Sequence, residues 1–77
     1  MLKVKKNVDL KRLSIFDFEY DENLKGYVKY FGNKKKEYLF INEDRILTKE
    51  NAKSFEYAMD NFINMLMHES IVYYKKG

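Results

Sequence analysis

The sequence contains no cysteine, no proline and no tryptophan, and it has one histidine and three glycines among its 77 residues. The absence of cysteine excludes a disulfide framework and a cysteine-based zinc site, and it favours a reducing compartment. One histidine excludes a multi-histidine metal site. No apolar run reaches the roughly 18 residues of a membrane helix, and lysines interrupt the start of the chain, where a secretory leader would be apolar. We therefore expect a cytoplasmic protein that is held together by its core alone.

The abundant residue types are lysine, asparagine, isoleucine, tyrosine and phenylalanine, whereas arginine and alanine each occur twice. Codons for the abundant types are rich in A and T, so this bias indicates an AT-rich genome, such as that of a low-GC bacterium or one of its phages. The net charge of +3 excludes an acidic DNA mimic and leaves nucleic-acid binding open. Two arginines are few for base-specific recognition, which favours the bidentate guanidinium group.

A helical pattern of apolar residues marks the second half of the chain. Six apolar side chains recur at positions that share one face of a helix: Ala52, Phe55, Met59, Phe62, Ile63 and Leu66. Thr48 is a suitable N-cap, and Glu50 would lie in the first turn, where the helix dipole favours an acidic side chain. The pattern predicts one long amphipathic helix over residues 49–68.

Two β-rich segments before this helix predict a hairpin. Residues 27–31 and 36–41 flank a Gly-Asn-Lys-Lys sequence, and a four-residue loop there would pair Tyr30 with Glu37. Residues 14–20 alternate between apolar and acidic side chains, which is typical of a strand with one buried face.

Both ends of the chain are compatible with two structures. Residues 1–13 fit either an edge strand or a short helical turn capped by Asn7, and residues 71–74 fit a helix extension or a last strand. The sequence predicts a single α+β domain over residues 1–77, in which a small antiparallel β-sheet of three or more strands packs against one long amphipathic α-helix.

The expected hairpin register assigns side chains to the two faces of the sheet. The face expected to pack against the helix carries seven aromatic and two lysine side chains: Phe16, Phe18, Tyr20, Tyr27, Phe31, Tyr38, Phe40, Lys29 and Lys36. The opposite face has an apolar centre, which we interpret as a partner-binding surface: Val28, Tyr30, Leu39 and Ile41. Three acids surround this centre: Asp17, Glu19 and Glu37. The hairpin loop adds three lysines that would steer association: Lys34, Lys35 and Lys36. The alternatives are that a chain end covers this centre, or that the two faces are reversed.

No group of residues forms a recognisable catalytic constellation. His68 has no nucleophile beside it in the pattern, and it lies near the expected helix end, where a cation is favourable. Asp17, Glu19 and Asp21 recur at strand spacing, and we interpret them as a solvated face rather than a cation site. The sequence predicts a protein that is not an enzyme, without catalytic residues, metal or cofactor.

Nucleic-acid binding is the alternative function. Lys25-Gly26-Tyr27 resembles the first three positions of the RNP1 strand motif of RNA-recognition motifs, but Val28 and Lys29 depart from the positions that follow. If the faces were reversed, a basic and aromatic surface for stacked bases would be exposed, made of Tyr27, Lys29, Lys36 and Tyr38.

In size, composition and sheet-plus-helix build, the chain is similar to small proteins encoded by phages of low-GC bacteria, including anti-CRISPR and other inhibitors of host functions. This resemblance assigns no residue. It implies stoichiometric binding to a host protein or nucleoprotein complex in the host cytoplasm, with nucleic-acid contact possible and no membrane partner. The predicted function is a non-enzymatic inhibitor or adaptor, and a homodimer through the apolar centre is a rival interpretation.

Overall fold

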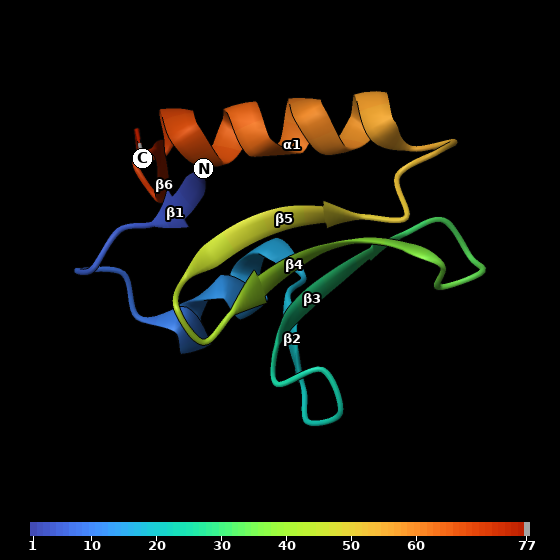
Figure 1. Ribbon diagram of the computed structural model, residues 1–77, viewed down its shortest axis with the longest axis horizontal. Helices are drawn as coiled ribbons and strands as arrows, with labels where there is room; N and C mark the ends of the chain where they lie inside the picture. Colours follow the sequence, from blue (N-terminus) through green and yellow to red (C-terminus); the bar gives the residue numbers. More distant parts are fainter. Residues whose placement is uncertain (77) are drawn as a thin grey trace.

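The computed structural model describes residues 1–76 (Figure 1). In chain order the elements are β1 (Leu2–Val4), the 3-10 helix η1 (Leu10–Phe16), β2 (Glu19–Asp21), β3 (Gly26–Phe31), β4 (Glu37–Asn42), β5 (Ile46–Glu50), α1 (Glu56–His68) and β6 (Val72–Tyr74). The strands form one antiparallel sheet in the order β2-β3-β4-β5-β1-β6. The predicted α+β class with a small antiparallel sheet is therefore confirmed.

The two ends of the chain meet in this sheet. Strand β1 lies between β5 and β6, and Met1 exchanges two hydrogen bonds with Lys75. Each possibility for residues 1–13 is met in part: β1 is a strand, although it lies inside the sheet, and residues 10–13 belong to the helix η1, which Asp9 rather than Asn7 caps. Of the two possibilities for residues 71–74, the structure has the last strand.

Helix α1 is shorter than predicted, with 13 residues that begin at Glu56. Thr48 is not an N-cap, because it lies in β5 opposite Phe40 of β4. A left-handed residue, Asn51 at φ 54°, follows β5, and the chain then turns toward the helix. The start of the predicted helix therefore forms a strand instead, because pairing with β4 outweighs the local helical spacing. No helix within residues 1–76 combines the length and the apolar character needed to cross a membrane.

The strand predicted over residues 14–20 is wrong in its first half. Asp9 caps η1 by accepting a hydrogen bond from the Lys11 backbone N–H, and the helix continues to Phe16. Asp17 then adopts a left-handed conformation, φ 68°, and its N–H closes the helix end. Only Glu19–Asp21 remain as a strand, paired with β3 in the expected register of Tyr20 opposite Tyr27.

The core lies on one face of the sheet, which both α1 and η1 cover (Figure 1). Met59, Ile63 and Leu66 from the predicted helical stripe are buried in it. The other buried members come from η1, the segment after it, and the strands: Leu13, Phe18, Val4, Leu39, Ile41, Leu47 and Val72. The opposite face of the sheet carries neither helix.

Candidate interaction surface

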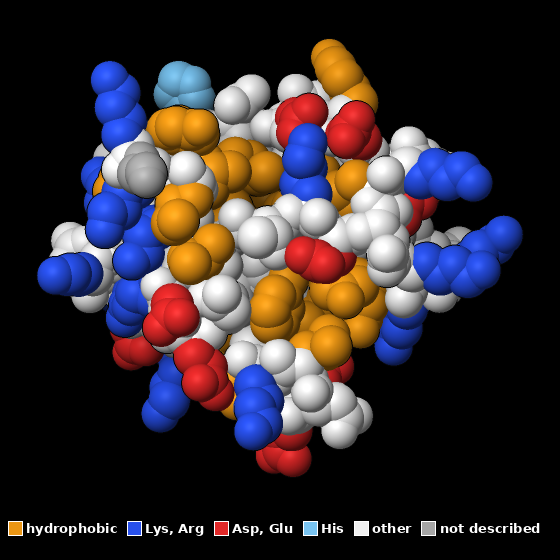
Figure 2. All heavy atoms as spheres, viewed as in Figure 1, with side chains coloured by type: hydrophobic (Ala, Val, Ile, Leu, Met, Phe, Trp, Pro, Cys, Tyr) orange, Lys and Arg blue, Asp and Glu red, His pale blue; other side chains and the backbone are white. Residues whose placement is uncertain are grey.

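Four side chains on the uncovered side of the sheet form a surface that we call the open face: Val28, Tyr30, Tyr38 and Phe40. The register pairs Val28 with Phe40 and Tyr30 with Tyr38, which places all four on one side of β3 and β4. Figure 2 shows hydrophobic side chains gathered over these two strands. The open face is therefore an apolar and aromatic area of the sheet that neither α1 nor η1 covers.

The aromatic rings of the open face support one another. The rings of Tyr30 and Tyr38 meet edge to face, with centroids 5.4 Å apart. Phe40 lies over Gly26, since a Cβ on that glycine would come within 2.6 Å of the ring. Val28 is only 3% exposed, so the three aromatic side chains supply most of the contact area that a partner would meet.

The expected placement of Leu39 and Ile41 on this surface is wrong. Both side chains are 0% exposed, and they pack in the core against α1. The hairpin loop contains five residues rather than four, because Phe31 pairs with Glu37. Since side chains alternate along a strand, a one-residue shift moves every side chain of β4 to the other face. Tyr38 and Phe40 therefore lie on the open face, and Leu39 and Ile41 lie on the core side of the sheet. On β3, the side chains of Tyr27, Lys29 and Phe31 lie on the side that was expected for them.

Charges of both signs border the open face. Glu19 lies opposite Val28 on β2, and Glu50 lies opposite Tyr38 on β5. At the hairpin end, Lys35 Nζ lies 5.9 Å from the centre of the Tyr30 ring. Partial burial raises the pKa of Tyr38 above its ordinary value, and the negative charge of Glu50 acts in the same direction. An apolar centre with a mixed polar rim is the arrangement of many protein interfaces.

Four lysines gather where the hairpin loop meets the connection before α1, and we call them the lysine cluster: Lys34, Lys35, Lys36 and Lys53. The first three were expected as steering charges and are exposed. Lys53 was missed, because its position in the expected helix placed it on a solvated helix face. Two shallow hollows of about 470 and 400 Å³ lie among these side chains.

Glu37 holds the connection between β5 and α1 against the hairpin by hydrogen bonds. Its Oε1 accepts hydrogen bonds from the backbone N–H groups of Lys53, at 2.7 Å, and Phe55, at 2.9 Å. The hydrogen bond from the Phe55 N–H lowers the pKa of Glu37 below its ordinary value. Desolvation acts in the opposite direction, whereas the N–H and the positive charge of Lys53 lower this pKa further. Glu37 was expected as an acid beside the apolar centre, but it serves as a local cap for residues 53–55.

The lowered pKa of Glu37 predicts that acid weakens this tie. A carboxylate with a lowered pKa stabilises the fold at neutral pH, and this contribution is lost as the pH falls through its ordinary and then its folded pKa. We expect the unfolding free energy of the natural chain to fall more steeply between about pH 6 and pH 3 than that of Glu37→Gln. Urea titrations across this range measure both curves, and parallel curves would contradict the prediction.

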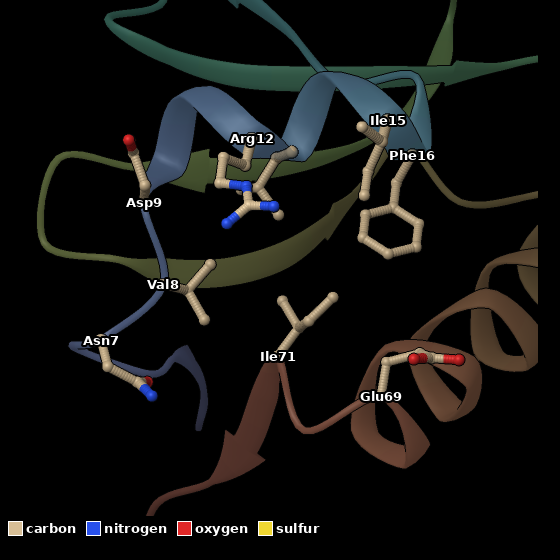
Figure 3. Close-up of a pocket in the computed structure, with 9 residues that line it drawn as sticks. Asn7, Val8, Asp9, Arg12, Ile15, Phe16, Glu69 and Ile71 are labelled. Carbon is tan, nitrogen blue, oxygen red and sulfur yellow. The ribbon is translucent and has the colours of Figure 1, made fainter.

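A further cleft of about 330 Å³ lies between η1 and the segment that leads into β6 (Figure 3). Val8, Phe16 and Ile71 form apolar walls, while Arg12 and Glu69 lie at its edge. Within residues 1–76 no polar or charged side chain is buried, so the cleft holds no sequestered acid, base or nucleophile. Its apolar walls can accept an apolar group.

The carboxylates and the histidine considered in the sequence do not come together. Asp17 lies 3.8 Å from Lys29, and Asp21 accepts hydrogen bonds from the turn that follows β2. His68 is exposed in the last turn of α1. In the described part of the chain, no three histidine, aspartate or glutamate side chains form a group that could hold a metal ion.

Comparisons of the chain with models of protein families, with curated proteins and with solved structures found no match. The open face and the lysine cluster are the two surfaces that combine a defined geometry with a recognisable chemistry.

Proposed function

We propose that this protein is a non-enzymatic inhibitor or adaptor that docks its open face on a partner protein. The observation that carries the proposal is the position of Tyr30, Tyr38 and Phe40 on the one sheet face that neither α1 nor η1 covers. Aromatic side chains are enriched among the residues that dominate binding energy, because they bury a large area at a low cost in rotamer freedom. The mixed rim of Glu19, Glu50 and Lys35 would fix the orientation of the partner.

The class of partner that we propose is supported by the resemblance in size and composition to small phage inhibitors. We propose a host protein or nucleoprotein complex, whose working surface the open face would cover by stoichiometric binding in the cytoplasm. Tyr30 and its neighbours hold no acid–base pair, so blocking a surface is the action that this chemistry supports.

Truncation of Tyr30 tests the proposal. We expect Tyr30→Ala to weaken partner binding by about 2 kcal/mol, roughly 30-fold, and to change the unfolding free energy by less, since the ring is partly exposed. Tyr57→Ala is the matched control, because Tyr57 is 80% exposed on α1, away from the open face. The measurement is affinity capture from nuclease-treated low-GC bacterial lysate, followed by titration of the captured protein against all three forms.

Loss of one captured protein in Tyr30→Ala but not in Tyr57→Ala supports the proposal. Equal retention by both variants would contradict it, as would recovery that disappears with nuclease. Sedimentation of the pure protein tests the rival interpretation, in which a second copy of the chain occupies the open face. If the protein is a dimer and Tyr30→Ala dissociates it, the open face is a self-association surface.

A further inference from the structure

The lysine cluster lies at one end of the molecule, at the edge of the open face, and the proposed protein docking uses only Lys35 of its four members. Figure 2 shows basic side chains projecting from this end, and Figure 1 places the hairpin loop beside the connection that leads into α1. We propose that the lysine cluster binds the phosphate backbone of a single-stranded nucleic acid, and that Tyr38 offers its ring to an unpaired base. This inference goes beyond the proposed function and does not depend on it.

Two separate segments hold the cluster in place. Asn51 donates a hydrogen bond from Nδ2 to the Lys36 carbonyl oxygen at 3.1 Å, and Glu37 accepts hydrogen bonds from the N–H groups of Lys53 and Phe55. These links keep the connection against the hairpin, so that Lys36 and Lys53 line the same hollow although they are distant in sequence. The positive charges therefore converge because of the fold and not only because three lysines are consecutive.

The charges of the cluster are available to an external anion. Within residues 1–76, the ion pairs of lysine side chains involve Lys29 and Lys49, and no member of the cluster takes part in one. Glu37 is the acid nearest to the cluster in sequence, and its carboxylate is engaged by backbone N–H groups of the connection. Four ammonium groups that form no ion pair within residues 1–76 favour a ligand that carries several negative charges at regular spacing.

Aromatic rings beside the lysines favour nucleic acid over an acidic peptide. Tyr38 lines the hollow of about 470 Å³ with Lys35, Lys36 and Lys53. Phe31 and Phe55 line the hollow of about 400 Å³ on the other side of Glu37. A positively charged groove combined with aromatic rings is the general means of binding single strands without sequence preference, because every base has a π-face. A duplex keeps its bases stacked inside, so it cannot use these rings.

The experiment measures fluorescence anisotropy of labelled oligo-dT of about 20 nucleotides, longer than the site sizes usual for small single-strand binders. The test variant replaces Lys34, Lys35, Lys36 and Lys53 with glutamine. The control variant replaces four other exposed lysines with glutamine and so carries the same net charge: Lys6, Lys11, Lys75 and Lys76. At about 50 mM salt we expect the test variant to bind at least 10-fold more weakly than the control, with a smaller salt slope. A second pair, Tyr38→Leu and Tyr38→Phe, should show at least about fivefold weaker binding for leucine only.

Equal affinities of the test and control variants would overturn the proposal, because net charge alone would then explain binding. Poly-glutamate that binds as tightly as oligo-dT would make the cluster a site for acidic peptides, and tighter binding of a duplex would exclude the role of Tyr38. Circular dichroism of every variant verifies folding. Since no partner protein is present, failure here leaves the capture experiment with Tyr30→Ala unaffected.

Discussion

Replacing Ile41 with alanine is expected to lower the unfolding free energy by about 2–5 kcal/mol. The side chain is 0% exposed and lies in the core beside Leu39 and Leu47. Truncation removes buried apolar area and leaves a cavity that the surrounding β-sheet can close only in part. A chain of 77 residues has a total stability of about 4–12 kcal/mol, so this one change would remove a large share of it.

Ile15→Ala provides the matched control for this prediction. The same atoms are removed, but Ile15 is 74% exposed at the end of η1, so we expect a change within about 0.5 kcal/mol. Urea unfolding of both variants measures the difference. If both changes had equal effects, Ile41 would not be a core residue and the register of β4 would need to be reassigned.

Replacing Gly26 with alanine is expected to destabilise the fold by about 1–3 kcal/mol. Gly26 lies at the start of β3, and an added Cβ would meet the carbonyl oxygen of Ile41 and come within 2.6 Å of two ring carbons of Phe40. The Phe40 ring can move only by leaving its place beside Val28, and the carbonyl oxygen can move only by distorting β4. This glycine, which matches a position of the RNP1 motif in sequence, therefore allows close packing beneath an aromatic ring.

A double-mutant cycle with Phe40→Leu separates the two obstacles. We expect Gly26→Ala to cost less in the Phe40→Leu background, because the ring is gone, but to retain part of its cost, because the Ile41 carbonyl oxygen remains. Thermal and urea unfolding of the four forms gives the coupling energy. A wild-type midpoint for Gly26→Ala alone would show that β3 and β4 are further apart at this point.

The fold class and the inward side of α1 were predictable because they depend on periodicity. The spacing of Met59, Ile63 and Leu66 identifies a helix face, and this spacing does not change with tertiary context. The start of the helix was not predictable in this way. Thr48 and Lys49 satisfy local rules for a helix start, but pairing with Phe40 and Leu39 in β4 places them in a strand.

The sequence by itself determined the α+β class with an aromatic-rich sheet and a lysine-rich hairpin loop, because composition and local spacing decide these features. Only the tertiary structure decided which residues of β4 face outward. One additional loop residue placed Tyr38 and Phe40 on the open face and Leu39 and Ile41 in the core, since side chains alternate with a period of two along a strand. The tertiary structure also placed Lys53 beside the lysines of the hairpin loop, because the hydrogen bonds of Glu37 join two segments that no local sequence pattern connects.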